Sequence, residues 1–556
     1  MPTARLFCAL LASAFALAAE QLAVTVLATT DLHGNIFPYD YYTGRQAPRG
    51  LAKAATLIRA ERERNPNSVL IDCGDTIQGS PIEYLYQRFV SSGRLPLGLR
   101  FPGEPWREEP TILAMNAIGY EALVVGNHDF NYGLKNLDHA RSQSRFPWLS
   151  ANITTEPGST RPPFEPYIVK DVGGVRVAII GLTTTNIPLW DPPEHYRGYR
   201  FTPIWTTAAD VVKSVRARVK PDIVVLAVHD GIEKDSQIQI PKGVDLIVYG
   251  HSHMQAEGYT MGSTLLVQPK NWAASVAKID FVIERRGRTN RIVDRRSRLI
   301  AVQKDTAVAG DIARLGEPYH EMAEKYLNTP VTQAVTDMSG ARGRIEDTPL
   351  VDAIQTVQLA YAKADVSLTA LFNPRIRVRK GPVTVRQLAA LYIYDNQLYA
   401  IEGTGRMLRD ALEVSALYFR SCETPACSSG PLIGKSVHGF NFDMAQGVTY
   451  QIDLREPAGH RIKNLRWKGS ALKDDQPLRI AINNYRAGGS GGYTMFRGAK
   501  VVWQSSEDIR DLMIQYYGGK HPLPAKADGN WRIEPPAARQ ELLKEVDAET
   551  ERAAER

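Results

Sequence analysis

Short apolar runs alternate with segments of helical periodicity through the first half of the chain. Leu51–Glu63 has its apolar residues at helical spacing and predicts an amphipathic helix. The apolar runs have the length of strands, and most are nearly continuous, which is typical of strands buried on both faces of a sheet. These runs are Val24–Ala28, Val69–Asp72, Ala122–Val125, Val175–Ile180, Ile223–Val228, Asp245–Tyr249 and Ile279–Glu284. The pattern predicts a layered α/β sandwich.

The pattern changes near Val331, and a second domain is expected from there. Helices are predicted near Leu350–Ala362 and Met407–Tyr418, and a strand over Gly447–Leu454. A chain of 556 residues is too long for one hydrophobic core. At least two domains are therefore expected.

The two domains are joined by a stretch that lacks continuous apolar runs. It begins with the basic, polar segment Arg285–Arg298 and continues as a predicted helix over Asp311–Leu327. We therefore expect a first domain over 20–305, a linker helix over 306–330, a second domain over 331–525 and a polar tail over 526–556. A hinge near 310–330 could bring the two domains together.

The first 19 residues have the features of a secretory signal peptide. A single early Arg5 precedes the apolar run Leu6–Ala18, and small residues follow. The run is short for a membrane anchor, which is the alternative. We expect cleavage near Ala19–Glu20 and export to a periplasm or to the outside, with no membrane span in the mature chain.

Composition changes this picture little. Hydrophobic residues make up 44% and charged residues 23% of the chain, as in soluble globular proteins. The 67 basic residues slightly outnumber the 60 acidic ones, and the excess is scattered along the chain. The sequence has no stripe of clustered basic and aromatic residues, so we do not expect it to bind a polymeric nucleic acid. An oxidising compartment favours a disulfide between Cys422 and Cys427, with two free thiols as the alternative, and Cys73 is expected to be buried.

Short polar motifs follow several of the predicted strands. Ends of parallel strands meet at one edge of a sheet, and Asp, Asn and His are ligands for divalent first-row metals. Enough ligands for two metal ions would converge there, which indicates a binuclear metal hydrolase. The motifs are Asp31-Leu32-His33, Gly74-Asp75, Gly126-Asn127-His128-Asp129, His229-Asp230-Gly231 and Gly250-His251-Ser252-His253. The histidines outside them are expected to be ordinary surface or core residues, namely His139, His195, His320, His438, His460 and His521.

In this order the motifs resemble those of the calcineurin-like metallophosphoesterases. Further segments resemble the secreted 5′-nucleotidases, and more closely their 2′,3′-cyclic-nucleotide 2′-phosphodiesterase/3′-nucleotidase branch. Those segments are Asp72–Pro81, Gly126–Gly133, Tyr392–Tyr399, Phe440–Met444, Gly447–Leu454 and Asn483–Ala487. The resemblance covers about residues 24–520 and implies an α/β fold, with a four-layer metallophosphatase sandwich followed by a smaller α/β (α+β) C-terminal domain of the 5′-nucleotidase type.

The resemblance also implies two sets of metal ligands that share Asp75. One metal ion would bind Asp31, His33, Asp75 and His253, and the other Asp75, Asn127, His229 and His251. Such mixed nitrogen and oxygen ligands suit zinc, manganese or iron, and the ligand types alone do not distinguish these three metals.

His128 is the catalytic residue that the resemblance implies. It would stabilise the pentavalent phosphorus or protonate the leaving oxygen, and it needs a partner that fixes its tautomer. In 5′-nucleotidases this partner is an Asp three residues later, whereas Asn131 stands here, a departure typical of the cyclic-phosphodiesterase branch. Asp129 is a candidate substitute, or merely caps the next turn.

By resemblance, Phe440 and Tyr485 would sandwich a nucleotide base, and Asn396 and Arg375 are candidate substrate contacts. The glycine-rich loop at 489–492 lacks the Asp that 5′-nucleotidases use for the ribose. We therefore expect a monomeric enzyme acting on 2′,3′-cyclic nucleotides and 3′-nucleotides. The alternatives on the same scaffold are a 5′-nucleotidase or UDP-sugar hydrolase, and a thiosulfohydrolase.

Overall fold

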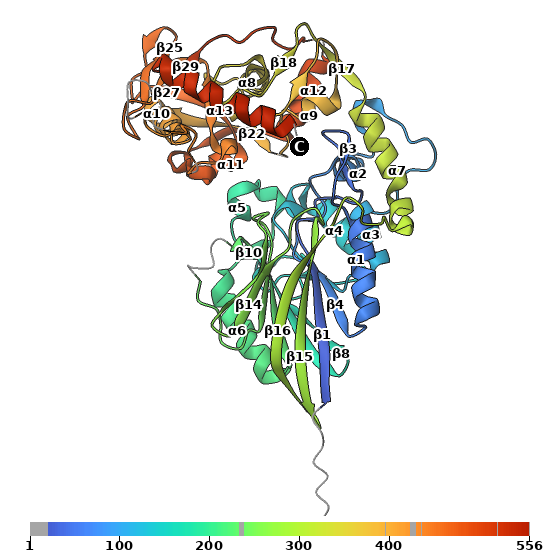
Figure 1. Ribbon diagram of the computed structural model, residues 1–556. Coiled ribbons are helices and arrows are strands. Elements are labelled where there is room, and N and C mark those ends of the chain that lie inside the picture. Colours follow the sequence, from blue (N-terminus) through green and yellow to red (C-terminus); the bar gives the residue numbers. More distant parts are fainter. Residues whose placement is uncertain are drawn as a thin grey trace, which may run out of the picture.

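A computed structural model describes residues 20–232, 238–394, 396–422, 427, 430–434, 436–519 and 521–554. The expected signal peptide, residues 1–19, lies outside the described residues. Figure 1 shows two stacked domains, with the N-terminal half of the chain below and the C-terminal half above. In the described part of the chain, no helix combines the length and the apolar character needed to cross a membrane.

Two six-stranded sheets form the centre of the first domain. In the first, β1, β4, β5 and β6 run parallel, and in the second β9, β11, β12 and β14 do. The first sheet has the order β16 (Thr289–Ala301), β15 (Ser275–Arg286), β1 (Glu20–Thr29), β4 (Ser68–Asp72), β5 (Ala122–Val124), β6 (Trp148–Leu149). The second has the order β13 (Ala256–Met261), β14 (Thr264–Gln268), β12 (Leu246–Tyr249), β11 (Ile223–His229), β9 (Val175–Thr183), β8 (Tyr167–Val172).

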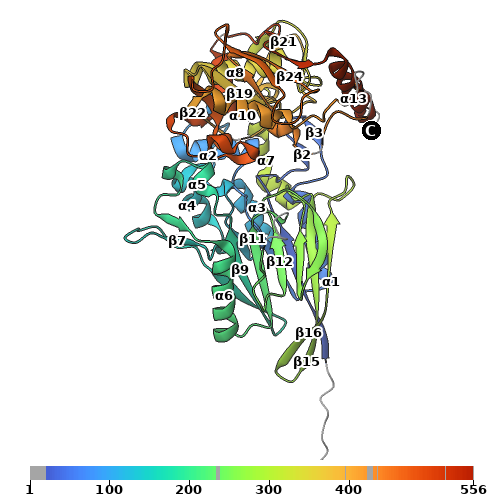
Figure 2. The ribbon, with the colours of Figure 1, turned by 90° about the vertical axis from the view of Figure 1, so that its left-hand side faces the viewer.

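Side chains from both sheets fill one core between them, and helices cover the two outer faces. Val26 and Ile71 of the first sheet pack with Val177 and Val225 of the second. The helices of this domain are α1 (Leu51–Arg64), α2 (Pro81–Ser92), α3 (Pro110–Ile118), α4 (Gly133–Gln143), α5 (Ile187–Trp190) and α6 (Ile204–Arg218). Figure 2 shows α1 and α6 on opposite outer sides of the sheets. The predicted four-layer α/β architecture is confirmed.

The predicted helix α1 shows why the sequence forms this layer. Leu51, Ala54, Ala55 and Ile58 recur at the spacing of one helical face, and all four are fully buried. The opposite face carries charged residues.

The basic segment Arg285–Arg298 is not part of a linker, as its composition suggested. Residues 289–301 form β16, which pairs antiparallel with β15 along its whole length. β16 lies at the edge of the first sheet, and Arg291, Arg296 and Arg298 on it are exposed. Charged residues on an edge strand hinder pairing with another chain, which explains a composition that resembles a linker.

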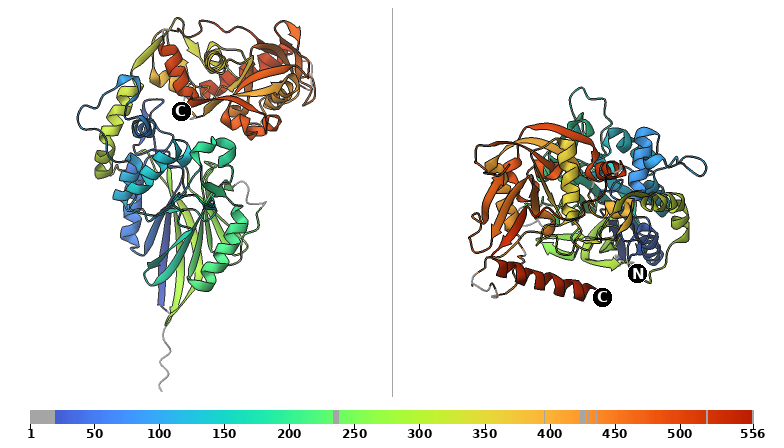
Figure 3. Two further views of the ribbon diagram at one scale, coloured as in Figure 1. Left: turned by 180° about the vertical axis from the view of Figure 1, so that it is seen from behind. Right: turned by 90° about the horizontal axis from the view of Figure 1, so that it is seen from above.

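Helix α7 (Gly310–Leu327) follows and connects the two domains (Figure 3). Ile312, Tyr319, Ala323 and Tyr326 are buried on it, in a hydrophobic core that also contains residues of both domains. The connection is therefore packed along its length rather than free.

The C-terminal domain contains a five-stranded and a four-stranded sheet. The first has the order β23 (Asp443–Gln446), β19 (Val366–Ala370), β27 (Pro477–Asn483), β22 (Gln397–Thr404), β28 (Val501–Asp508), and the second β26 (Ser470–Ala471), β25 (Ile462–Trp467), β24 (Val448–Asp453), β29 (Trp531–Glu534). The helices are α8 (Pro349–Ala362), α9 (Val385–Ala389), α10 (Gly405–Ala416), α11 (Asn484–Ala487), α12 (Ile509–Gly518) and α13 (Pro536–Ala554). Short two-stranded pairs complete the fold: β2 (Tyr39–Asp40) with β3 (Arg45–Gln46), β7 (Ile153–Thr155) with β10 (Tyr199–Phe201), β17 (Pro330–Ala334) with β21 (Gly381–Thr384), and β18 (Met338–Ser339) with β20 (Arg377–Val378).

The segment expected as a polar tail contributes to this domain. β29 pairs parallel with β24, and Ala538 and Leu542 of α13 are buried in the C-terminal core. The polar composition belongs to the outer face of α13, which lies at the rim of the domain in the view from above (Figure 3). Cys422 and Cys427 form a disulfide, and Cys73 is free and buried.

Replacing Phe281 by Ala should destabilise the first domain strongly. The Phe281 side chain is 0% exposed between the two sheets, so its removal leaves a cavity and should lower the free energy of unfolding by about 3–5 kcal/mol. Urea unfolding followed by tryptophan fluorescence measures the change. Val293→Ala on β16 is the control, because Val293 is 44% exposed and should change stability by less than about 0.5 kcal/mol. Equal losses in both variants would contradict this account of the core.

Candidate metal centre

The polar motifs of the first domain meet at one edge of the two sheets. Asp31, Asp75 and Asn127 follow the neighbouring parallel strands β1, β4 and β5, while His229 ends β11 and His251 follows the adjacent β12. The backbone N–H of His251 donates to both carboxylate oxygens of Asp31, at 3.1 and 3.0 Å. The loops of the two sheets are thus joined directly.

Two groups of side chains could each hold a metal ion. Asp31, His33 and His253 form the first group, and Asp75, His229 and His251 the second. Within each group, one potential ligand atom from every residue lies within 4.8 Å of the others. The structure therefore brings together the six residues and divides them as the resemblance implied.

Asp75 lies between the two groups. Its Oδ2 is 3.1 Å from His229 Nε2 in the second group and 3.9 Å from His33 Nε2 in the first. Asn127 Oδ1 also lies 3.1 Å from His229 Nε2, which places Asn127 beside the second group. Asp75 is 1% exposed, so its carboxylate is buried between imidazoles of the two groups. A buried carboxylate oxygen of this kind fits a position shared by two cations.

The protonation of the histidines is compatible with metal binding. Burial lowers the pKa of His33 and of His251 to about 4, so both imidazoles are neutral near pH 7. Against the effect of burial, Asp75 raises the pKa of His229 to about 10. The Asp75–His229 pair therefore holds a proton that a divalent cation would displace.

Backbone groups orient two of these imidazoles. His229 Nδ1 lies 2.6 Å from the carbonyl oxygen of Cys73, and His33 Nδ1 lies 2.9 Å from that of Gln78. A carbonyl oxygen can only accept, so Nδ1 donates in both rings, and Nε2 is left to face the centre. The donor set thus fits two cations bound by nitrogen and oxygen.

Five of the candidate ligands adopt left-handed backbone conformations, which are uncommon for residues other than glycine. Their φ angles are 50° for Asp31, 47° for His33, 61° for Asp75, 71° for His251 and 55° for His253. Such strain concentrates at functional sites.

Close packing of the loops requires glycine at Gly126. A Cβ atom there would lie 2.2 Å from Asp75 Oδ1.

Asp129, considered as a partner of His128, has its carboxylate directed at the loop backbone. Its oxygens accept from the N–H groups of Gly126 and Thr76, both at 2.8 Å, and of Ile77 at 3.2 Å. These bonds fix two ligand loops relative to each other.

His128 begins the short 3₁₀ helix His128–Phe130 beside the first group. Its backbone N–H donates to Asp75 Oδ1 at 2.8 Å, and its ring centroid is 5.4 Å from that of His33. His128 Nδ1 lies 2.6 Å from Asn131 Oδ1. The structure therefore places the expected catalytic residue at the centre and pairs it with Asn131.

Phe440 lies in the short 3₁₀ helix Gly439–Asn441 of the C-terminal domain, and Tyr485 lies in α11. Arg486 holds them together: its guanidinium donates to the carbonyl oxygen of Phe440 at 2.8 Å and lies 5.4 Å from the Tyr485 ring. Arg486 also forms a buried ion pair with Asp443 at 2.7 Å. Phe440 is 37% exposed, so its ring is available for stacking, and His438 stacks on it at 5.1 Å.

Asn396 and Arg375 are the other expected substrate contacts. Asn396 Oδ1 accepts from Tyr392 Oη at 3.4 Å, and the Tyr392 hydroxyl also accepts from Asn483, which precedes α11. Arg375 is exposed in the loop between β19 and β20. Its role stays a prediction.

Trp190 joins the metal centre to the C-terminal domain, and sequence reasoning missed it. Its ring stacks on His251 with centroids 5.4 Å apart, and its Nε1 donates to Ser490 Oγ at 3.1 Å. Asn484, beside Tyr485, donates to the Trp190 carbonyl oxygen. Trp190 lies in α5, whose four residues give no periodic signal in the sequence. The aromatic pair is thus seated next to the metal-binding edge.

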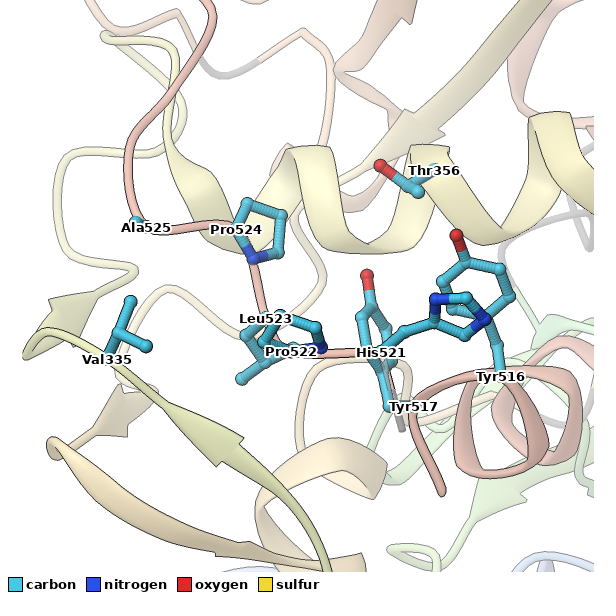
Figure 4. A pocket seen from close by; sticks show the side chains of 9 residues that line it. All are labelled: Val335, Thr356, Tyr516, Tyr517, His521, Pro522, Leu523, Pro524 and Ala525. Atoms are coloured by element: carbon cyan, nitrogen blue, oxygen red, sulfur yellow. The ribbon is translucent and has the colours of Figure 1, made fainter. Parts of the chain in front are cut away.

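Two cavities lie outside the centre itself. A polar cavity of about 150 Å³ is lined by Arg88, Asn131 and His195 from the first domain and by Gln397 and Asp508 from the second. The other, of about 320 Å³, lies within the C-terminal domain between the 521–525 segment and the side chains of Val335, Thr356 and Tyr516 (Figure 4). Its lining is mostly apolar and offers no cluster of metal ligands among the described residues.

Comparison with known proteins gives two family matches. Residues 24–255 match calcineurin-like phosphoesterase, and residues 326–498 match the C-terminal domain of 5′-nucleotidase. The 2′,3′-cyclic-nucleotide 2′-phosphodiesterase/3′-nucleotidase of Salmonella typhimurium is 28% identical over 92% of this chain and 88% of its own length. The trifunctional nucleotide phosphoesterase of Bacillus subtilis is 28% identical over 93% of this chain, which spans only 39% of that protein.

A solved structure from Staphylococcus aureus, described as a 5′-nucleotidase, covers 92% of this chain with a TM-score of 0.76 at 26% identity. All of that structure is covered by the match. The chain therefore combines a calcineurin-like phosphoesterase domain over residues 24–255 with a 5′-nucleotidase C-terminal domain over residues 326–498, as expected of a metal-dependent phosphoric ester hydrolase.

Proposed function

We propose that this protein is an exported, monomeric phosphoesterase with two metal ions that hydrolyses 2′,3′-cyclic nucleotides and 3′-nucleotides. The observation that carries the proposal is the meeting of two groups of candidate ligands, with Asp75 between them and Trp190 connecting the same edge to the helix of Tyr485. The similarity to the Salmonella enzyme supports the substrate class. Export rests on the sequence of residues 1–19.

Two divalent cations bound there, zinc, manganese or iron, would supply an activated water nucleophile and neutralise charge on the phosphoryl group. Asp31, His33, Asp75 and His253 would hold one, and Asp75, Asn127, His229 and His251 the other. The buried carboxylates and the imidazole nitrogens of these residues would hold both cations in place.

His128 faces this centre and donates its proton to the oxygen that leaves phosphorus. Its neighbour Asn127 belongs to the ligand set, which keeps the imidazole close to the reacting phosphate. Phe440 and Tyr485 would stack on the two faces of the base, so recognition tolerates any base.

A 5′-nucleotidase on the same scaffold is the alternative, and the Staphylococcus structure is described as one. Two features favour the cyclic and 3′ substrates. Asn131 replaces the acidic partner of His128, and the loop at 489–492 contains no acidic residue for the ribose. Ser490 of that loop instead accepts a hydrogen bond from Trp190.

Phosphate release from 2′,3′-cyclic AMP, 3′-AMP and 5′-AMP should be fastest with the first two substrates. Chelation should abolish all activity, and manganese or zinc should restore it. Asp75→Asn should lower kcat by about 1,000-fold or more, because the shared ligand loses its charge. Asp305→Asn, at an exposed position, is the matched control and should leave kcat unchanged. Preference for 5′-AMP would establish the alternative.

Removal of either aromatic ring should weaken nucleotide binding. Phe440→Ala and Tyr485→Ala should each raise KM for 3′-AMP by about 5- to 150-fold, since stacking on one ring contributes about 1–3 kcal/mol. KM for p-nitrophenyl phosphate, which has no base, should change little. Leu417→Ala, an exposed apolar position in the same domain, serves as the control. Equal effects on both substrates would exclude a base-stacking role.

A further inference from the structure

Four side chains form a hydrogen-bonded chain that leads away from the metal centre. His128 Nδ1 lies 2.6 Å from Asn131 Oδ1, and Asn131 Nδ2 donates to Asp191 Oδ1 at 2.9 Å. His195 Nδ1 lies 3.2 Å from the same Asp191 oxygen. Asp191 is 6% exposed, and its Oδ2 has no hydrogen-bond partner in the described structure. Neither Asp191 nor His195 belongs to any motif of the sequence.

The chemistry of these groups fixes the direction of every bond. An ionised carboxylate can only accept, so the Asn131 amide must present its NH₂ group to Asp191. Its carbonyl oxygen then faces His128 and can only accept. His128 Nδ1 must therefore carry a proton, which leaves Nε2 as the ring atom that takes and gives a proton in the centre.

We propose that Asp191 is a positioning residue for His128 and acts through the side-chain amide of Asn131. This inference rests on the proposed function, in which His128 protonates the leaving oxygen. The proton moves from His128 Nε2 to that oxygen as the phosphorus–oxygen bond breaks, while Nδ1–H stays bonded to Asn131. Asp191 neither gains nor loses a proton.

Among the described residues, Asp191 is the side chain that accepts from the Asn131 NH₂ group. Without this acceptor the amide can turn over, because either end of an amide can face an imidazole. His128 could then place its proton on the wrong nitrogen or rotate. The loss should depend on the leaving group. An alkoxide such as the ribose oxygen of 3′-AMP needs protonation, whereas p-nitrophenolate leaves without it.

The test compares hydrolysis of 3′-AMP and p-nitrophenyl phosphate by the metal-loaded full chain. Asp191→Ala should lower kcat for 3′-AMP by about tenfold or more and kcat for p-nitrophenyl phosphate by less than about twofold. Asp191→Asn keeps an acceptor for Asn131 and should recover most of the activity. Glu194→Gln removes an exposed charge nearby and is the matched control. Equal losses on both substrates, or no loss, would overturn the proposal.

Two further measurements keep the proposal testable. Asn131→Ala should reproduce the loss on 3′-AMP and replaces Asp191→Ala if that variant does not fold. Nitrogen NMR of the zinc-loaded protein with ¹⁵N-labelled histidine rings, assigned with His128→Ala, should show a proton on His128 Nδ1 that disappears in Asp191→Ala. Its persistence would overturn the proposal whatever the substrate is.

The variant His128→Ala distinguishes a failure of the proposed role of His128 from a failure of the proposed role of Asp191. If this variant retains full 3′-AMP hydrolysis, the role of His128 in the proposed function fails, and the NMR measurement alone decides on Asp191. If it abolishes hydrolysis and Asp191→Ala behaves like Glu194→Gln, only the present inference fails.

Discussion

The structure depends on one buried carboxylate, Asp75, placed between two groups of imidazoles. A fully desolvated charge is costly unless opposite charges compensate it. Although burial opposes ionisation, His229, His128 and His33 hold the pKa of Asp75 well below its usual range. The same carboxylate accepts the backbone N–H of His128, so the candidate metal ligands and His128 are held by one common group. The glycine at 126 is needed because this carboxylate lies against its backbone.

The second constraint is the contact between the domains. Trp190 touches a candidate metal ligand with its ring and the C-terminal domain with its indole N–H and its carbonyl oxygen. On the other side, Arg386 of α9 pairs with Glu324 of α7 at 2.9 Å. Because α7 is packed into a core common to both domains, a hinge at 310–330 would have to separate buried side chains. The structure represents a state in which the two domains are in direct contact beside the candidate metal centre.

Local sequence patterns were sufficient for the strands and for the metal-binding edge. Asp31, Asp75 and His229 could be placed because each directly follows or ends an apolar run, and ends of parallel strands converge by geometry. Residues whose role depends on distant partners could not be found this way. Asp191 lies 60 positions from Asn131, and Trp190 contacts His251 and two residues of the C-terminal domain, all of them distant in the sequence. β16 was misjudged because an exposed edge strand and a linker have the same polar composition.

The left-handed conformations of the candidate ligand residues link metal binding to the stability of the fold. Each of these conformations costs on the order of 1 kcal/mol relative to ordinary backbone. All five occur in the loops that carry the candidate metal ligands. A cation that binds only the folded loops offsets this cost by mass action. Metal binding would thus stabilise the folded conformation of these loops, and the free energy of unfolding should rise with the concentration of free metal.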